Sequence, residues 1–282
     1  AQLYFIATIT SYRLYSSGIQ ILASVGEAYG TLFGTSYVRD ANGNVVVDAN
    51  GLPKISTTNK TLGKFTPDWT GGISNTFSYR SLSLSFLIDA SVGGSIFSNT
   101  NKTGKYTGVL ANTLSGRDAE HGGLWYYTAA MGNNVRLPES PSYSVSSDGL
   151  YYAQVNGQST RVYQDGIMVE GVTESGSKNE EVVSAEKYYH RIYSIAEANV
   201  YDASYVKLRE VALSYRLPRL WTQKLHLQEA SVTLTGRNLW TIYKSVPNID
   251  PESALTTGNA QGVEAYSLPT TRSFGVNLSV KF

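Results

Sequence analysis

The C-terminal end of the chain has the most regular alternation of apolar and polar residues. From residue 273 to 282 every second residue is apolar, and those between are small, polar or basic. Successive side chains of a strand point to opposite faces, so a period of two predicts a strand with one apolar face. That face carries Phe274, Val276, Leu278, Val280 and Phe282.

Earlier segments repeat this pattern and predict an all-β fold. Residues 69–79 and 81–90 form a predicted hairpin, and 203–216 and 228–243 are predicted as long strands. Less regular alternation predicts further strands at 1–12 and 18–24. Near Arg209 the phase slips by one residue, which indicates a β-bulge or a strand that leaves a membrane and reverses its environment.

The predicted strands fit two kinds of sheet. An apolar face can pack in the core of a soluble sandwich or meet lipid in an outer-membrane barrel. The longest apolar run has five residues, whereas a membrane-spanning helix needs about 20. A helical membrane protein is therefore excluded, and both β readings stay open on this pattern.

The lengths of the connections separate these two readings. The turns at 79–81 and 217–227 are short, whereas the links at about 25–68, 91–202 and 244–270 are long. If the chain end is periplasmic, counting strands up and down puts every long link on the other side. Barrels have short periplasmic turns and long outer loops, so the pattern favours a barrel in which these links are extracellular loops.

The long links contain turn signals and aromatic clusters. Asn42-Gly43 and Asn50-Gly51 flank a valine triplet and predict a small hairpin with type I′ turns. The aromatic residues can stack on sugar rings, contact a peptide or pack against one another, and these readings stay open. They are the candidate substrate or partner contacts Trp125, Tyr126, Tyr127, Tyr151 and Tyr152.

Composition and motifs argue against several other functions. Charged residues make up 16% of the chain and the formal net charge is +1, so no basic surface points to nucleic acid. The segment from Asp40 resembles the start of a calcium loop, but Val45 and Gly51 stand where that loop needs Gly and Glu. There is no cysteine, no nucleophile elbow and no phosphate-binding loop. We therefore predict no catalytic residue, no cofactor and no metal.

Several segments, in family order, resemble the C-terminal part of the SusC/RagA family of TonB-dependent outer-membrane transporters of Bacteroidetes. The most specific is YDASYVKLREVALSYRLP at 201–218. The others are VGEAYGTLFG at 25–34, LGKFTPDWTGG at 62–72, LTGRNLWTIY at 234–243, DPE at 250–252 and the strand at 272–282.

This resemblance implies a fold and a setting. The chain would be the C-terminal portion of a large antiparallel transmembrane β-barrel of about 22 strands. The plug and the N-terminal domains are expected outside it. The implied location is the outer membrane of a Gram-negative, Bacteroidetes-like cell, with lipid against the barrel.

The resemblance also implies a function, which is TonB-dependent active import of oligomeric nutrients. Expected partners are a SusD-like surface lipoprotein, the TonB complex and a substrate that is a glycan or a peptide; no enzyme activity is expected. Two alternatives stay open: a passive outer-membrane porin, and a secreted β-rich carbohydrate-binding or hydrolytic domain.

Overall fold

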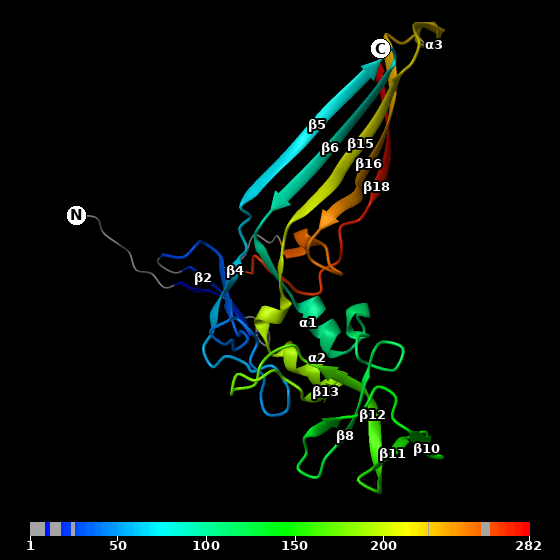
Figure 1. Cartoon of the computed structure of the whole chain (residues 1–282). Coiled ribbons are helices and arrows are strands. Elements are labelled where there is room, and N and C mark those ends of the chain that lie inside the picture. Colours follow the sequence, from blue (N-terminus) through cyan, green and yellow to red (C-terminus); the bar gives the residue numbers. More distant parts are fainter. Residues whose placement is uncertain (1–8, 12–17, 24–25, 225, 255–259) are drawn as a thin grey trace, which may run out of the picture.

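A long antiparallel sheet extends from a larger group of short strands, helices and loops (Figure 1). The computed structural model describes residues 9–11, 18–23, 26–224, 226–254 and 260–282. We call the long sheet the wall sheet and the rest, residues 26–68, 93–204, 245–254 and 260–272 with the short strands before them, the loop region.

The wall sheet has five strands in the order β18-β16-β15-β6-β5. Its strands are β5 (Trp69–Tyr79), β6 (Leu82–Val92), β15 (Tyr205–Arg216), β16 (Glu229–Lys244) and β18 (Ser273–Lys281). These are the segments with regular alternation, and they have 9 to 16 residues. A tilted strand that crosses a bilayer needs about 9–11 residues.

The register of the wall sheet collects the apolar residues on one face. Leu84 lies opposite Phe77 on one side and Leu213 on the other, and the same row continues through Leu234 to Val276. Directly paired residues share a face, so the row crosses all five strands. These side chains are 38–73% exposed in the chain alone. The apolar face has no cover among the described residues.

A β-bulge at Arg209 accounts for the slip in the sequence pattern. Leu208 pairs with Ile88 and Glu210 pairs with Leu87, which are consecutive residues of β6. Arg209 is therefore the extra residue of β15 between these two pairs. On β16 the register also shifts, and Asn238 there has a left-handed φ of 51°. The bulge reading of the sequence is confirmed, and Asn238 is explained as a bulge residue that interrupts the apolar alternation.

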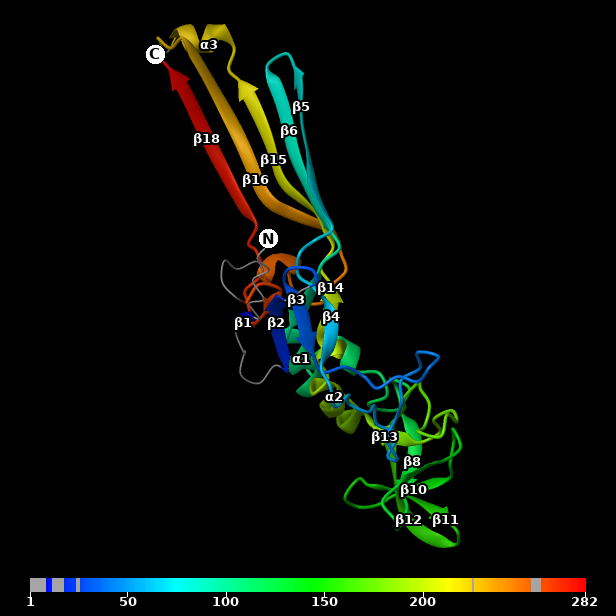
Figure 2. The ribbon, with the colours of Figure 1, turned by 90° about the vertical axis from the view of Figure 1, so that its left-hand side faces the viewer.

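The connections sort to the two ends of the wall sheet. Residues 80–81 form a tight turn and residues 217–228, with α3 (Arg219–Lys224), connect β15 to β16 at the same end. The three long links all lie at the opposite end, as Figure 2 shows from the side. Which compartment that end faces remains a prediction.

The loop region is built of small sheets rather than of irregular chain. One sheet has the order β1-β2-β3-β4, a second β14-β7-β17, and a third β10-β11-β12-β8-β9 with β13 paired to β12. The strands are β1 (Ile9–Ser11), β2 (Ile19–Ala23), β3 (Thr31–Gly34), β4 (Lys60–Lys64), β7 (Ser95–Ser98), β8 (Leu124–Thr128), β9 (Asn134–Arg136), β10 (Tyr143–Val145), β11 (Tyr151–Val155), β12 (Gln158–Met168), β13 (Val182–Ser184), β14 (Val200–Asp202) and β17 (Val263–Glu264).

Two α-helices and short 3-10 turns join these sheets into one packed region. The helices are α1 (Asn99–Tyr106) and α2 (Ala185–Tyr193), and the turns are η1 (Ala111–Thr113), η2 (Ala196–Asn199) and η3 (Pro251–Ala254). One core cluster joins Leu32, Phe97 and Val263 from three different links, and a second joins Ile96 to Val246. The long links therefore pack against one another instead of extending separately.

The turns at the two Asn-Gly pairs differ from the prediction. A type I′ turn needs positive φ at both central residues, but only Gly43 and Gly51 are left-handed. The Gly43 N–H donates to the Asp40 carbonyl, and the Asp40 N–H donates to the Asn44 carbonyl. Each loop is thus a type I turn followed by a left-handed glycine. The Asp40 carboxylate stabilises it by accepting hydrogen bonds from the Asn42 and Asn44 N–H groups.

None of the helices in the described ranges is long and apolar enough to cross a bilayer. The predicted strands at 1–12 and 18–24 correspond in part to β1 and β2, and residues 1–8, 12 and 24 lie outside the described residues.

Candidate functional site

The polar face of the wall sheet carries small uncharged side chains in its middle. One row runs Ser78, Ser83, Ser214, Thr233 and Asn277 across the five strands. Hydroxyls pair along it, with 2.8 Å between Ser78 and Ser83 and 2.9 Å between Ser214 and Thr233. Water can hydrate such a face, so the wall sheet separates an apolar surface from a hydrophilic one.

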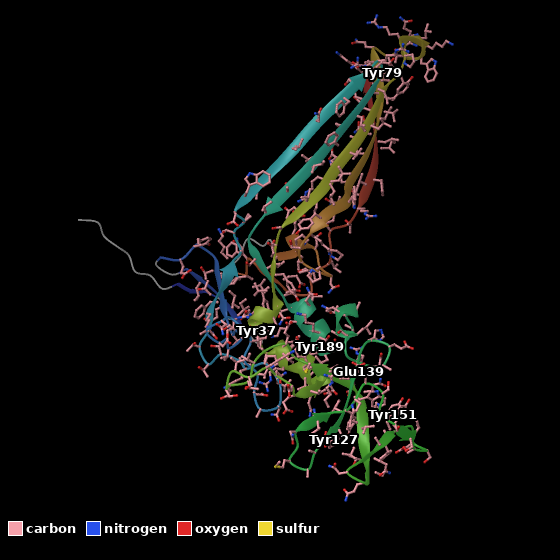
Figure 3. The ribbon with its side chains drawn as sticks, viewed as in Figure 1. Tyr37, Tyr79, Tyr127, Glu139, Tyr151 and Tyr189 are labelled. Atoms are coloured by element: carbon pink, nitrogen blue, oxygen red, sulfur yellow. The ribbon has the colours of Figure 1, made fainter. Side chains whose placement is uncertain are left out.

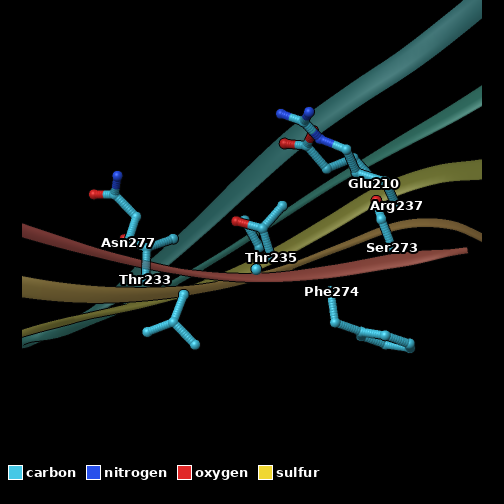
Figure 4. A pocket seen from close by; sticks show the side chains of 10 residues that line it. Glu210, Thr233, Thr235, Arg237, Ser273, Phe274 and Asn277 are labelled. Atoms are coloured by element: carbon cyan, nitrogen blue, oxygen red, sulfur yellow. The ribbon is translucent and has the colours of Figure 1, made fainter.

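A groove of about 490 Å³ lies on this polar face along β16 and β18. In Figure 4 Thr233, Thr235 and Asn277 stand on one side of the ribbon, with Glu210 and Arg237, and Phe274 points to the other. Arg237 Nε donates to Glu210 Oε2 across 2.9 Å, and both side chains are exposed. The groove thus offers hydroxyl, amide and paired charged groups to a hydrated ligand.

Where the polar face meets the loop region, five charged residues form an ion-pair cluster: Asp89, Lys207, Arg209, Asp250 and Glu252. Lys207 Nζ lies 2.6 Å from Asp250 Oδ1 and 2.6 Å from Glu252 Oε2. Arg209 pairs with Glu252 and, at 2.6 Å, with Asp89. The Lys207 side chain is 4% exposed. Every charge in the cluster is therefore paired, as buried charges require, and Lys207, Asp250 and Glu252 are largely buried.

The local sequence explains this arrangement. The bulge at Arg209 lets Lys207, Arg209 and Glu210 all interact with groups on the polar side of the sheet. In the facing link Asp250 Oδ1 accepts from the Glu252 N–H at 3.0 Å, so the aspartate shapes the η3 turn that presents both carboxylates. The two acids of one link thus face the two bases of one strand.

These hydrogen bonds shift the titration of the two link carboxyls. Burial alone would raise the pKa of Asp250, but hydrogen bonds from Lys207 and Thr270 outweigh it and lower that pKa to about 2. Burial would likewise raise the pKa of Glu252, but hydrogen bonds from Arg209 and Lys207 outweigh this effect and lower that pKa as well. Both groups are anionic at neutral pH, and the cluster holds the 245–254 segment onto the wall sheet.

A second polar lock ties the same link to α1. Glu264 is fully buried and accepts hydrogen bonds from the Ser98 hydroxyl at 2.7 Å and the Thr100 hydroxyl at 2.6 Å. The N–H groups of Thr100 and Ser267 also donate to it. A carboxylate at the start of a helix satisfies donors that the helix leaves free. The link is therefore held at two places: Asp250 and Glu252 bind to β15, and Glu264 binds to the start of α1.

The predicted contact aromatics fall on two faces of one small sheet, far from the wall sheet (Figure 3). Trp125 is 5% exposed and packs on Tyr143 and Tyr151, with ring centroids 4.9 and 5.4 Å apart. Tyr126 is equally buried, on the other face, and its hydroxyl donates to Asp165 at 3.0 Å. The rings of Trp125 and Tyr126 therefore pack inside the loop region and are not accessible to a ligand.

The other predicted contacts are more accessible. Tyr151 is 39% exposed, and Tyr127 and Tyr152 are half-buried. A contact role for the five aromatics remains a prediction, with Tyr127, Tyr151 and Tyr152 the ones that a ligand can reach. The described residues contain no cluster of three metal-binding side chains.

The barrel-assembly residues predicted at the C-terminus lie on the apolar face of β18 and just beyond it. They are Phe274, Val276, Leu278, Val280 and Phe282, and they are 41–82% exposed in the chain alone. Their role in assembly remains a prediction.

Sequence reasoning missed the ion-pair cluster. Two signals were present: the phase slip at Arg209 and the acid–Pro–acid segment at 250–252. Neither says that residues more than 40 apart in sequence meet, which only the packing of the link on the sheet determines.

Comparison with known proteins finds a related sequence and several structural matches. No protein-family model matches this chain. TonB-dependent receptor P3 of Formosa agariphila is 26% identical over 263 residues, which cover 91% of this chain and 20% of that protein. The structural match to the RagAB peptide importer in the "closed-closed" state covers 96% of this chain and 25% of the importer chain, with a TM-score of 0.49 and 17% identity. The match to the importer in the "open-open" state covers 100% of this chain and 25% of the importer chain, with a TM-score of 0.47 and 17% identity.

The chain spans about a fifth of the length of the curated relative. The match to this TonB-dependent receptor confirms the resemblance that the sequence motifs indicated. The strands of the structure confirm the all-β fold class, and the match to a TonB-dependent receptor agrees with the expected outer-membrane location.

Proposed function

We propose that this chain, as a relative of TonB-dependent outer-membrane receptors, forms part of a barrel wall through which a longer protein imports hydrated oligomers. The observation that carries this proposal is the two-faced wall sheet. Its apolar face is uncovered and its polar face carries hydroxyls, and strands of 9 to 16 residues are long enough to cross a bilayer.

The edges of the wall sheet support a larger barrel. Within the described chain β5 pairs only with β6, and β18 pairs only with β16. Unpaired backbone groups in lipid cost several kcal/mol each, so both edges need further strands. A chain that covers a fifth of its relative leaves room for those strands elsewhere in the protein.

The packed loop region supports the import role. Three long links are joined by shared core clusters and by the ion-pair cluster at one end of the wall sheet. We assign this end to the extracellular side, where the links would help to enclose a glycan or peptide and contact a SusD-like lipoprotein. Energy would come from the TonB complex through parts of the protein outside this chain. We assign no enzyme activity to it.

Uptake by cells that express the full-length protein tests the proposal. Labelled oligosaccharides and oligopeptides of graded length should enter only when both the protein and TonB are present. Uptake that survives loss of TonB would instead indicate a passive porin. Recovery of the protein in the soluble fraction after carbonate washing would contradict every membrane assignment and favour a secreted domain.

A further inference from the structure

The end of the wall sheet opposite the long links carries an unusual concentration of basic residues. The β5–β6 turn, α3 and the end of β18 all lie at this end of the sheet in both Figure 1 and Figure 2. We call this the basic rim; it consists of Arg80, Arg216, Arg219, Lys224 and Lys281.

The basic rim is not balanced by acids. Within residues 79–82, 216–229 and 279–282, Glu229 is the one acidic side chain, and it pairs with Arg216 at 2.9 Å. Arg80 lies over the ring of Tyr79, 5.3 Å from its centroid. The rim therefore presents several cations to its surroundings, and it suits a partner with negative charge.

Helix α3 adds apolar side chains to this rim. Thr222 is 2% exposed and packs inward, while Leu220 is 73% and Trp221 58% exposed. At 100° per residue, Leu220, Trp221 and Lys224 lie on the side of the helix opposite Thr222. This outward side combines an indole, a leucine and an ammonium, the combination found in helices that lie at a membrane surface.

The position of the rim identifies the surface that it meets. The rim follows directly on the row of the apolar face that contains Tyr79, Leu82 and Tyr215. Aromatic rings at the ends of membrane strands lie at the level of the lipid headgroups. A surface continuous with the lipid-facing side, with Trp and Leu outward and surplus cations, matches phospholipid better than it matches a protein groove.

We propose that α3 and the basic rim bind anionic phospholipid headgroups of the leaflet at this end of the barrel. Trp221 and Leu220 insert at the boundary of headgroups and acyl chains, and Arg219 and Lys224 contact phosphates. This inference rests on the proposed membrane placement of the wall sheet and adds a lipid-binding site to it.

Depth-dependent quenching tests the insertion of α3. A fluorophore is attached at Leu220→Cys or Gln158→Cys in an otherwise cysteine-free full-length protein, in vesicles of phosphatidylcholine and phosphatidylglycerol with brominated acyl chains. Gln158 is exposed in the loop region, at the opposite end of the wall sheet from α3, so it is the control that stays away from these acyl chains. We expect several-fold stronger quenching at position 220. Equal, weak quenching at both positions would mean that α3 faces water or a protein.

A charge variant tests the headgroup preference. With bromine on the phosphatidylglycerol alone, the label at position 220 should be quenched more than with bromine on the phosphatidylcholine alone. Arg219→Gln with Lys224→Gln should remove that difference. A wild-type protein without the difference would overturn the assignment to anionic headgroups. If uptake persists while the α3 results are negative, this inference fails alone; loss of membrane association altogether would instead refute the proposed function.

Discussion

Lys207 and Glu252 are 45 residues apart in the chain, yet the Lys207 ammonium donates to the Glu252 carboxylate across 2.6 Å. This contact joins a strand of the wall sheet to the link that packs where its polar face meets the loop region. The same ammonium holds Asp250, so one buried cation anchors both acids of the link.

Lys207→Met should release the 245–254 segment. Removing one partner of a buried ion pair leaves uncompensated charge and costs about 3 to 5 kcal/mol. Limited proteolysis of the full-length protein in detergent should show faster cleavage in this segment. Lys54→Met is the control, because the Lys54–Glu174 pair is exposed and worth about 1 kcal/mol or less. Equal protection in both variants would contradict an anchoring role.

The ion-pair cluster should weaken in acid. The pKa of Asp250 is lowered to about 2 and that of Glu252 is lowered as well, so their stabilisation is complete above the ordinary carboxyl pKa near 4. It is lost as the pH falls from about 4 toward 2. The protection factors of residues 245–254 against hydrogen exchange, which are corrected for the intrinsic pH dependence of amide exchange, should fall over that window. In Asp250→Asn the protection should be lower at neutral pH and change less with acid; the wild-type pH response in this variant would refute the assignment.

Arginine should distinguish the two faces of β18. Leu278 lies on the apolar face and Asn277 in the hydroxyl row on the other. Leu278→Arg should cost about 2 to 4 kcal/mol near the bilayer midplane and reduce the heat-modifiable, folded fraction in outer-membrane preparations. Asn277→Arg should be tolerated. Similar assembly of both variants would contradict the assignment of the apolar face to lipid.

Loss of Glu264 should loosen the second lock. Glu264→Ala leaves the Ser98 and Thr100 hydroxyls without their acceptor in a buried site, at a cost of about 1 to 3 kcal/mol. Hydrogen exchange should rise in α1 and in residues 260–267 together. Glu186→Ala, at an exposed position of α2, is the control and should leave both segments unchanged.

The aromatic cluster should separate stability from ligand contact. Trp125→Ala removes a buried ring that packs on Tyr143 and Tyr151, so it should cost about 3 to 5 kcal/mol of the stability of this small sheet. Tyr152→Ala should leave the sheet folded by hydrogen exchange. If Tyr152 contacts substrate or a partner lipoprotein, uptake should fall in that variant all the same. Normal uptake with Tyr152→Ala would remove this residue from the predicted contacts.

The sequence by itself determined the wall sheet. Alternation in 69–79, in 203–216 on either side of the slip at Arg209, and in 273–282 predicts strands and their two faces, because neighbouring side chains of a strand must point to opposite sides. The slip at Arg209 predicts the bulge, and the lengths of the links predict that they sort to one end. These are local properties, so residue order alone carries them.

Tertiary structure decided how the links are used. The Asn-Gly pairs form type I turns with a left-handed glycine because Asp40 and Asp48 accept backbone hydrogen bonds around each turn. The ring of Trp125 is buried because β8 and β11 both lie against β12. Lys207 contacts Asp250 and Glu252 because residues of different links pack in a common hydrophobic cluster at one end of the sheet. Such long-range contacts depend on packing and desolvation, which no local pattern of residues encodes.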